Sequence, residues 1–479
     1  MRIPHILFTL SGLLLILGGS LGLPLIFSLM EGDGLSGYFL IEITALLVVG
    51  VILRRILPRP EHLALREGFL IVSLSWILLS FLGSLPFMLS GHIPALTDAF
   101  FETMSGFTTT GATILKEIEI LPRSLLVWRS MTQWLGGMGV IALAVAIFPS
   151  LGVGASQLFK AEAPGPIKEK VSPRISQTAK ILWFVYLVFT AAETMLLVLG
   201  GLDFFEALCT TFSTLATGGF SPRNDSIAAY PSPYVHYVIT LFMFLAGANF
   251  NLHYFMIRGR LSAYGRDSEF CFYGGITLLA LGTLVLLRLT AGTSLSEELF
   301  RSTLFQAVSI LTTTGFITHD YETWPLASQV ILLFLMFVGG CTSSTGGAIK
   351  NIRVQILLKH IVSELKKLFR PHGVFPIKIG NRPIPEAIVS NVMGFFVLYV
   401  LLFALGVLSM SALDLDLATS VGSVAATLGN VGPGLGDVGP VDNYSAVPAL
   451  GKWILSFLML AGRLEIFTVL VLFLPRFWR

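Results

Sequence analysis

Four short segments of this sequence combine small polar residues with glycine and carry no charge. They read TTTGA at 108–112, LATGGF at 215–220, TTTGF at 312–316 and NVGPG at 430–434. Glycine adopts backbone angles that are closed to other residues, so consecutive peptide carbonyls can point to one side. Rings of such carbonyls replace the hydration shell of a cation in selectivity filters. The residue types therefore predict a binding site for a dehydrated cation.

The segments recur at a regular spacing. Aligned on Gly111, Gly218, Gly315 and Gly432, they are separated by 107, 97 and 117 residues, which indicates an internal repeat. A tight turn between two helices would explain any one segment, but four copies at comparable positions favour the cation site. The expected ligands are Thr109, Thr110, Gly111, Ala112, Ala216, Thr217, Gly218, Gly219, Thr313, Thr314, Gly315, Phe316, Asn430, Val431, Gly432 and Pro433.

The composition indicates an all-α integral membrane protein. Hydrophobic residues make up 54% of the chain and charged residues 12%, whereas soluble proteins carry roughly 25% charged residues. Apolar runs of about 20 residues, long enough to cross a bilayer as helices, flank each polar segment. The expected pairs of spans are 67–89 and 125–149, 175–199 and 234–257, 270–289 and 326 onward, and 384–410 and 446–474. Two further spans, 6–30 and 37–57, precede the repeats.

Each pair of spans encloses a short segment that cannot cross the membrane. These segments are 96–108, 204–215, 295–311 and 415–427. Irregular backbone is tolerated at membrane depth only where it lines water or is buried in protein, so each segment is expected to be a re-entrant half-helix with an extended return. Four such hairpins around one pseudo-fourfold axis would form a pore. The expected units are 1–60 with two helices, and repeats at 61–158, 159–262, 263–370 and 371–479.

Lysine and arginine gather in the connections between repeats. Segments 54–66, 160–180, 258–266 and 350–382 hold four, five, three and eight of them, and Arg2, Arg476 and Arg479 lie at the termini. The positive-inside rule places these segments and both termini in the cytoplasm, with an even number of crossings between copies. The repeats are then parallel, whereas many alternating-access secondary transporters have inverted repeats, which makes a cation-coupled carrier the alternative. Because the basic residues lie beside spans, they do not indicate nucleic-acid binding.

The four segments and the two leading spans resemble the TrkH/KtrB/HKT superfamily of potassium transporters, and NVGPGLG at 430–436 resembles the fourth filter of its TrkH branch. The resemblance implies potassium uptake across the cytoplasmic (inner) membrane, with K⁺ as the transported ion and no organic cofactor. It also implies a homodimer that sits on cytosolic nucleotide-binding regulatory subunits of the TrkA type. Gly111 argues for potassium, because serine at this position goes with sodium preference in some plant relatives.

The third repeat contains GGCTSSTGGAIK at 339–350, which has too many glycines and small polar residues for a stable helix across lipid. Close packing of helices is one interpretation. The resemblance favours an unwound gating loop at 339–347 beneath the filter, whose expected residues are Gly339, Gly340, Thr342, Ser343, Ser344, Thr345, Gly346 and Gly347.

Arg463 lies near the middle of the last span, where a charge is a functional candidate. Pairing with Glu465 is disfavoured, because residues two apart on a helix do not face each other. The resemblance places Arg463 just below the filter, where a positive charge roughly 7 Å from a potassium ion raises its energy by about 2 kcal/mol.

Acidic residues lie at or before the starts of the short segments: Asp98, Glu102, Asp203, Glu206, Glu297, Glu298, Asp414 and Asp416. They are expected either to cap the half-helices or to form a vestibule that concentrates cations. The histidines are scattered, and neither paired carboxylates nor a metal-site motif is present, so the sequence does not predict an enzyme. Passive flow and coupling to protons or sodium both fit these residues.

Overall fold

Helices make up most of the chain that the computed structural model describes, which is residues 1–60, 63–146, 175–380 and 382–479. Within that part, strands form a single antiparallel hairpin of β1 (Lys378–Ile379) and β2 (Arg382–Pro383). Among the described residues, six helices are long and apolar enough to cross a membrane, or eight if each of two bent helix pairs counts as one span. The all-α membrane fold expected from the sequence is confirmed.

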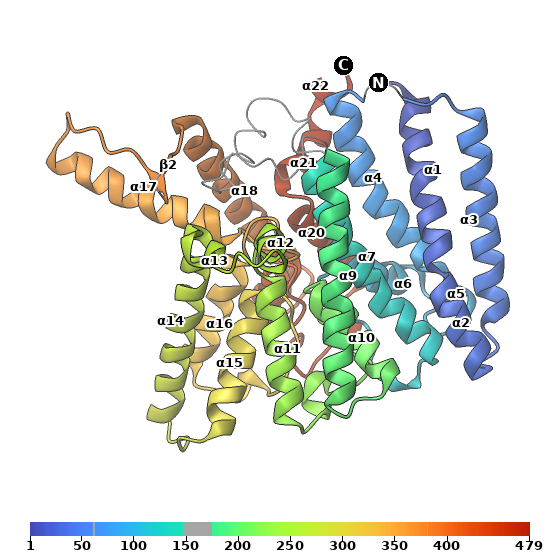
Figure 1. Cartoon of the computed structure of the whole chain (residues 1–479), viewed down its shortest axis with the longest axis horizontal. Coiled ribbons are helices and arrows are strands. Elements are labelled where there is room, and N and C mark those ends of the chain that lie inside the picture. The colour runs from blue at the N-terminus through green and yellow to red at the C-terminus, as the bar shows by residue number, and fades with distance from the viewer. Residues whose placement is uncertain (61–62, 147–174, 381) are drawn as a thin grey trace.

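Two leading spans lie outside the repeats. The first is a long, slightly interrupted helix made of α1 (Ile3–Ser20) and α2 (Gly22–Glu31), and the second is α3 (Ser36–Ile56). α1 packs against α3 and α4, and α2 packs against α7, so the pair covers one side of the first repeat (Figure 1).

The rest of the chain falls into four groups, each with a span, a short half-helix and a second span. The first contains α4 (Leu65–Gly83), α5 (Leu85–Leu89), half-helix α6 (Leu96–Phe107), η1 (Ile118–Ile120) and α7 (Arg123–Ala146). The second contains α9 (Ile175–Leu199), half-helix α10 (Phe204–Leu215), η3 (Ser226–Ala229), α11 (Pro233–Ala246), α12 (Phe250–Ile257) and α13 (Ser262–Arg266).

The last two groups repeat this order. The third contains α14 (Ser268–Thr290), half-helix α15 (Glu297–Leu311), η4 (Tyr321–Thr323), α16 (Leu326–Val338) and α17 (Asn351–Phe369). The fourth contains α18 (Glu386–Ser411), half-helix α19 (Leu417–Leu428), η5 (Tyr444–Ala446), α20 (Ala449–Arg463), α21 (Ile466–Leu470), η6 (Val471–Phe473) and α22 (Pro475–Trp478). The predicted bounds of the half-helices lie within two residues of these.

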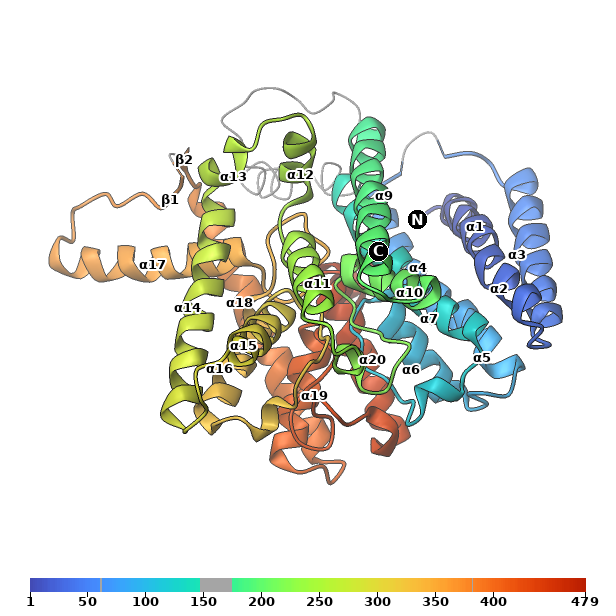
Figure 2. The same cartoon turned by 60° about the horizontal axis from the view of Figure 1, so that its bottom comes forward.

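The four groups surround one centre, as Figure 2 shows. The second span of each group packs against the half-helix of the next: α7 on α10, α11 on α15, and α16 on α19. The second span of the last group, α20, packs on α6 of the first and closes the ring. The half-helices therefore end at a common centre, where the polar segments begin.

The second spans differ from the sequence expectation because most of them are broken. α11 and α12 meet at an angle of 108°, and α20 meets the helix that follows it at 117°, so 234–257 and 446–474 are not continuous spans. The break in the second group follows Gly247, where Asn249 caps α12 through the Asn251 N–H. The break in the fourth is at Glu465, whose φ is +59°. α16 ends at Val338, and residues 339–350 separate it from α17.

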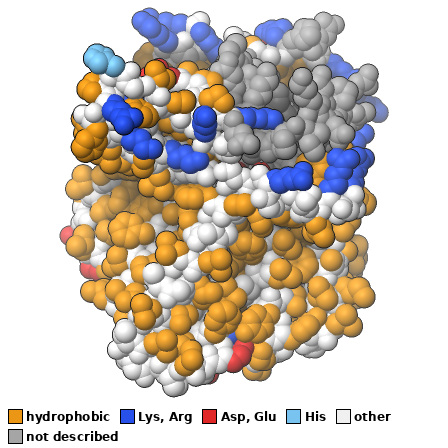
Figure 3. Space-filling view, turned by 60° about the vertical axis from the view of Figure 1, so that its left-hand side comes forward, with side chains coloured by type: hydrophobic (Ala, Val, Ile, Leu, Met, Phe, Trp, Pro, Cys, Tyr) orange, Lys and Arg blue, Asp and Glu red, His pale blue; other side chains and the backbone are white. Residues whose placement is uncertain are grey.

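Basic side chains gather at one end of the molecule. Figure 3 shows lysine and arginine above a broad surface of hydrophobic side chains, and both termini lie at the same end (Figure 1). The helix α17 also projects from the body there (Figure 1). The predicted boundary at 158/159, the end of the span 125–149 and most of the basic segment 160–180 lie outside the described residues.

Candidate functional site

The four hairpins have the same backbone conformation where they leave their half-helices. In each, one N–H donates back to a half-helix carbonyl at 2.8 Å: Thr110 to Ser105, Gly218 to Ser213, Thr314 to Ser309 and Val431 to Ala426. The residue before each donor has a positive φ: Thr109 (53°), Thr217 (51°), Thr313 (61°) and Asn430 (53°). The residue after each donor is a glycine with a positive φ: Gly111 (85°), Gly219 (76°), Gly315 (80°) and Gly432 (102°).

This correspondence corrects the alignment of the second repeat by one residue. Gly219, and not Gly218, occupies the position of Gly111, Gly315 and Gly432. The sequence aligned Gly218 there because two glycines are adjacent and the letters do not indicate which one is left-handed. Ala216 accordingly corresponds to Thr108 and Thr312, and Phe220 replaces Gly219 as the counterpart of Phe316.

The hairpins contact one another as a closed ring. A Cβ atom at Gly111 would lie 2.2 Å from the Gly218 carbonyl oxygen, and one at Gly219 would lie 2.0 Å from that of Thr314. The series continues with Gly315, where a Cβ atom would lie 2.0 Å from the Val431 oxygen, and with Gly432, where it would lie 2.6 Å from the Thr110 oxygen. Glycine is thus required four times because each hairpin backbone touches a carbonyl of its neighbour.

An open cavity of about 70 Å³ lies directly on this ring, and the four left-handed glycines line it. Ala112 and Pro433 also line it, whereas Phe316 is buried behind its hairpin. Uncharged backbone carbonyls from four sides suit an alkali cation that has lost its water. The cavity gives such an ion a path to the ring.

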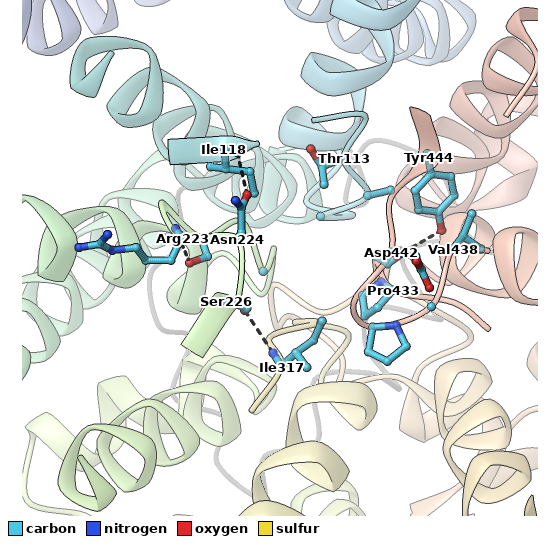
Figure 4. A pocket seen from close by; sticks show the side chains of 18 of the residues that line it. Thr113, Ile118, Arg223, Asn224, Ser226, Ile317, Pro433, Val438, Asp442 and Tyr444 are labelled. Carbon is cyan, nitrogen blue, oxygen red and sulfur yellow. Dashed lines mark hydrogen bonds between the residues drawn. The ribbon is translucent and has the colours of Figure 1, made fainter. Parts of the chain in front are cut away.

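Hydrogen bonds between loops hold the rim of the cavity, as Figure 4 shows in part. The loops of repeats one and two are joined by Ile118 N and Asn224 Oδ1 at 2.7 Å, and those of repeats two and three by Ile317 N and Ser226 Oγ at 3.3 Å. Repeats three and four are joined by Tyr321 Oη and the Gly434 oxygen at 2.8 Å, and repeats four and one by Tyr444 N and the Thr113 oxygen at 2.8 Å. The rim is therefore closed in the same cyclic order as the glycine ring.

The side chains of the hairpins alternate around the ring. In repeats one and three, two threonine hydroxyls bond each other, Thr108 with Thr110 at 2.8 Å and Thr312 with Thr314 at 2.7 Å. Repeats two and four have no hydroxyl at these positions, which are Ala216 and Gly218, and Gly429 and Val431. The ring is fourfold in its backbone and only twofold in its side chains.

The first residues of the hairpins have different partners. Asn430 Nδ2 donates to Thr110 Oγ1 at 3.0 Å and to the Met459 oxygen at 2.9 Å, which links repeats four and one. Thr313 Oγ1 accepts the Gly347 N–H at 2.8 Å. Thr217 Oγ1 bonds the Ala216 oxygen, whereas the Thr109 hydroxyl is buried without a hydrogen-bond partner in the described part of the chain.

The segment 339–350 is irregular, as the sequence predicts. Gly339, Ser343, Ala348 and Lys350 all have positive φ. Non-glycine residues in this region cost of order 1–3 kcal/mol each, so surrounding contacts must hold them. Glu269 supplies two of these contacts, because its Oε1 accepts the Thr342 N–H at 2.7 Å and the Thr342 hydroxyl at 3.0 Å.

The same loop lies against the inner side of the ring. Thr345 Oγ1 donates to the Leu215 oxygen at 2.9 Å, at the end of half-helix α10. A Cβ atom at Gly347 would lie 2.6 Å from the Gly429 oxygen, at the end of α19, and one at Gly346 would lie 3.1 Å from the Thr312 oxygen. Gly340 approaches the Gly247 oxygen, where α11 is broken, and Ser344 Oγ bonds the Cys341 oxygen. The loop therefore touches three hairpins at once.

Arg463 contacts this loop directly. Its Nη1 donates to the Thr345 oxygen at 2.5 Å, and 5% of the residue is exposed. Glu465 instead pairs with Arg353 at 2.7 Å, so the disfavoured Arg463–Glu465 pair does not form. Among the described residues, no carboxylate forms an ion pair with Arg463.

A brace on one face of α7 was not found from the sequence. Arg129 Nε pairs with Glu102 Oε1 at 2.6 Å, both side chains being buried, and Arg129 Nη1 donates to the Ser221 oxygen at 2.9 Å. Gln133 lies one turn further along the same face, donates to the Gly218 oxygen at 2.6 Å and accepts the Phe220 N–H at 3.0 Å. The signal in the sequence that could have indicated this brace is a pair of polar residues four apart in an otherwise apolar span.

The outer carboxylates mostly cap helices or pair with basic residues. Glu102 is buried and accepts the Ile114 N–H at 2.9 Å, so it does not belong to a vestibule. Asp203 and Asp416 cap α10 and α19, and hydrogen bonds from Thr419 lower the pKa of Asp416. The remaining pairs are Asp98 with Lys452, Glu206 with Arg223, Glu297 with Arg301 and Glu298 with His319. Asp414 lies in a turn with φ +63°.

Comparisons with known proteins agree over the whole chain. The family model TrkH, described as "Cation transport protein", matches residues 39–268 and 277–479. The Trk system potassium uptake protein TrkH of Salmonella typhimurium is 45% identical, over 98% of this chain and 98% of its own length. The protein of the same name from Halomonas elongata is 41% identical over all of both chains.

A solved structure has the same fold. The crystal structure of the potassium transporter TrkH from Vibrio parahaemolyticus superposes with a TM-score of 0.92 at 39% identity, covering all of both chains. At this identity and coverage the likeness extends to the arrangement of every repeat.

Proposed function

We propose that this chain, which belongs to the TrkH family of cation transport proteins, takes up potassium through the ring of four hairpins. Gly111, Gly219, Gly315 and Gly432 and their neighbours supply the backbone oxygens that replace the water of the ion. The observation that carries this proposal is the closure of the ring, in which each left-handed glycine lies against a carbonyl of the next hairpin. Relatives are named as potassium uptake proteins, so the chain is a transporter and not an enzyme.

The loop 339–347 and Arg463 form the proposed gate. The loop contacts the inner ends of hairpins two, three and four, so an ion that leaves the ring meets it first. Arg463 donates a hydrogen bond to the Thr345 carbonyl and places a positive charge beside the loop. No carboxylate in the described part of the chain forms an ion pair with this charge. The gate opens in this proposal when the loop withdraws from the hairpins and Arg463 moves with it.

The charged end of the molecule supports the proposed orientation in the membrane. The basic end, with both termini, faces the cytoplasm of the cell (inner) membrane, and the hairpins face outward. The cavity above the ring is then the entrance for the ion. The divisions 1–60, 61–158, 159–262, 263–370 and 371–479 are the leading helices and the four pore repeats.

The proposed assembly is a homodimer with cytosolic nucleotide-binding regulatory subunits of the TrkA type. The basic segment 350–382, which includes the projecting helix α17, is the candidate docking surface (Figure 1). A Trk system, by its name, has more than one component, and a subunit that moves α17 would pull on the loop immediately before it.

Flux in liposomes tests the proposal. Purified protein is reconstituted in vesicles with imposed potassium, sodium and proton gradients, and ion movement is followed with ion-selective dyes. We expect potassium uptake that exceeds sodium uptake and is absent in protein-free vesicles. Equal movement of both ions, or no potassium movement in a folded variant whose loop 339–347 is shortened, would contradict the proposal.

A further inference from the structure

The second hairpin has a glycine that the backbone itself does not require. Gly218 is not among the residues with positive φ, so its conformation is open to any L-amino acid. What excludes a side chain is Gln133, because a Cβ atom at Gly218 would lie 2.4 Å from the Gln133 Cδ. The Gln133 amide therefore occupies the space that a hairpin side chain fills elsewhere.

Gln133 is fixed in this place at both ends of its amide. It donates to the Gly218 oxygen and accepts the Phe220 N–H, so it spans the left-handed Gly219 between them. Arg129, one turn away, holds the next carbonyl, that of Ser221, and its guanidinium lies 3.6 Å from the centre of the Phe220 ring. Gln133 and Arg129, on one face of α7, thus hold the backbone of residues 218–221 in place.

The equivalent places at two other interfaces are apolar. Gly136 and Gly462 are equivalent, because each lies against the last carbonyl of its own half-helix, so Met459 corresponds to Gln133. Gly137 and Gly247 each lie against the next hairpin, at Ala216 and Thr312, which makes Met243 the counterpart in α11. By the same correspondence, Met459 faces Thr110 and Met243 faces Thr314. Both threonines have a side chain at the position where the second hairpin has Gly218.

We propose that Gln133 positions the second hairpin and determines part of the ion selectivity of the ring. A carbonyl oxygen has two lone pairs, and the Gln133 N–H uses one of them at Gly218. This hydrogen bond fixes the direction of the carbonyl and draws electron density from it, so the second hairpin offers a weaker oxygen to the ion. The inference rests on the proposed potassium pathway and assigns one side of the ring to a residue outside the hairpins.

Selectivity of two single variants and their combination tests this role. Gln133→Met keeps the length of the side chain and removes both hydrogen bonds, and we expect the ratio of potassium to sodium flux to fall about fivefold. Gly218→Ala, made alone, should lower this flux ratio further, because the anchored Gln133 amide cannot move away from the added methyl group. In the double variant the free thioether can yield to the added methyl group, so Gly218→Ala should do less harm there than in the wild type.

Gln329→Met is the matched control. Gln329 also holds two backbone carbonyls, those of Glu322 at 2.6 Å and Trp324 at 3.0 Å, but neither carbonyl belongs to the glycine ring. We expect its selectivity ratio to equal that of the wild type. Wild-type selectivity in folded Gln133→Met, or equal harm from Gly218→Ala in both backgrounds, would overturn the inference while leaving the potassium pathway intact. Wild-type protein that carries no potassium would instead overturn the pathway.

Discussion

The glycine ring and the loop 339–347 lie next to each other but are built in opposite ways. Four repeats contribute equally to the ring, through backbone contacts that leave no room for a side chain. The loop comes from one repeat and is held by hydrogen bonds to side chains, among them Glu269, Thr313 and Arg463. A repeated backbone suits a site that must surround an ion, whereas a single inserted segment can move without disturbing the other repeats.

The largest effect is expected from a substitution that breaks the ring itself. Gly219→Ala places a methyl group 2.0 Å from the Thr314 oxygen and forces alanine into the left-handed region, which costs of order 1–3 kcal/mol for the backbone alone. We expect potassium flux in liposomes to fall roughly a hundredfold. The control is Gly282→Ala on α14, where no atom lies within 4 Å, and its flux should not change. Normal flux in Gly219→Ala would show that Gly219 is not part of the ring.

Removing the loop should act in the opposite direction. Deleting residues 340–347 removes the hydrogen bonds to Glu269, Thr313 and Leu215, each of which contributes about 1 kcal/mol to the closed state. We expect flux to rise more than about tenfold while the potassium preference, which resides in the ring, is retained. A shortened protein that elutes as the wild type and shows wild-type flux would refute the gating role of the loop.

Arg463→Ala should also raise flux, by less. It removes the charge that opposes the cation and the hydrogen bond to the Thr345 oxygen, but it leaves the loop in place. At an effective dielectric constant of about 20, the charge raises the energy of an ion roughly 7 Å away by about 2 kcal/mol, and because the loop still obstructs the path we expect about half of this to appear in the barrier, a roughly fivefold increase in flux. Lys452→Met on the same helix removes a positive charge that pairs with Asp98, and this control should not raise flux. An unchanged or lower rate in folded Arg463→Ala would contradict the role of the charge.

The smallest expected effect comes from removing one of the contacts between the ring and the loop, the hydrogen bond at Thr313. Thr313→Val removes the acceptor of the Gly347 N–H with little change of shape, and we expect flux to rise about two- to fivefold. Thr109→Val is the matched control, because its hydroxyl has the same place in repeat one and no partner in the described chain. Equal effects of the two substitutions would place the role of Thr313 in the ring and not in the gate.

The sequence predicted the elements that repeat and missed the contacts that do not. Composition and spacing were sufficient for the half-helices, and the bounds 204–215 agree fully with α10. The register of the second hairpin failed, because the sequence does not distinguish the left-handed Gly219 from Gly218. The breaks at Gly247 and Glu465 were also missed, since both segments are apolar enough for continuous spans.

The brace on α7 was beyond prediction for a different reason. Gln133 and Gly218 are 85 residues apart, and their contact exists only because the second span of one repeat packs on the half-helix of the next. Arg129 and Glu102 could be suspected as buried charges in apolar segments, but their partners depend on the same packing. The unwound loop was predictable, because four glycines in one short segment disfavour a helix without reference to any partner.

The position of a bound ion would show whether the glycine ring is the potassium site. Thallium or rubidium, soaked into crystals in place of potassium, would be located by anomalous scattering. We expect density on the axis between Gly111, Gly219, Gly315 and Gly432, within coordination distance of carbonyls from all four hairpins. Ion density that lies away from this axis, or that contacts one or two repeats while the ring is unoccupied, would contradict this expectation.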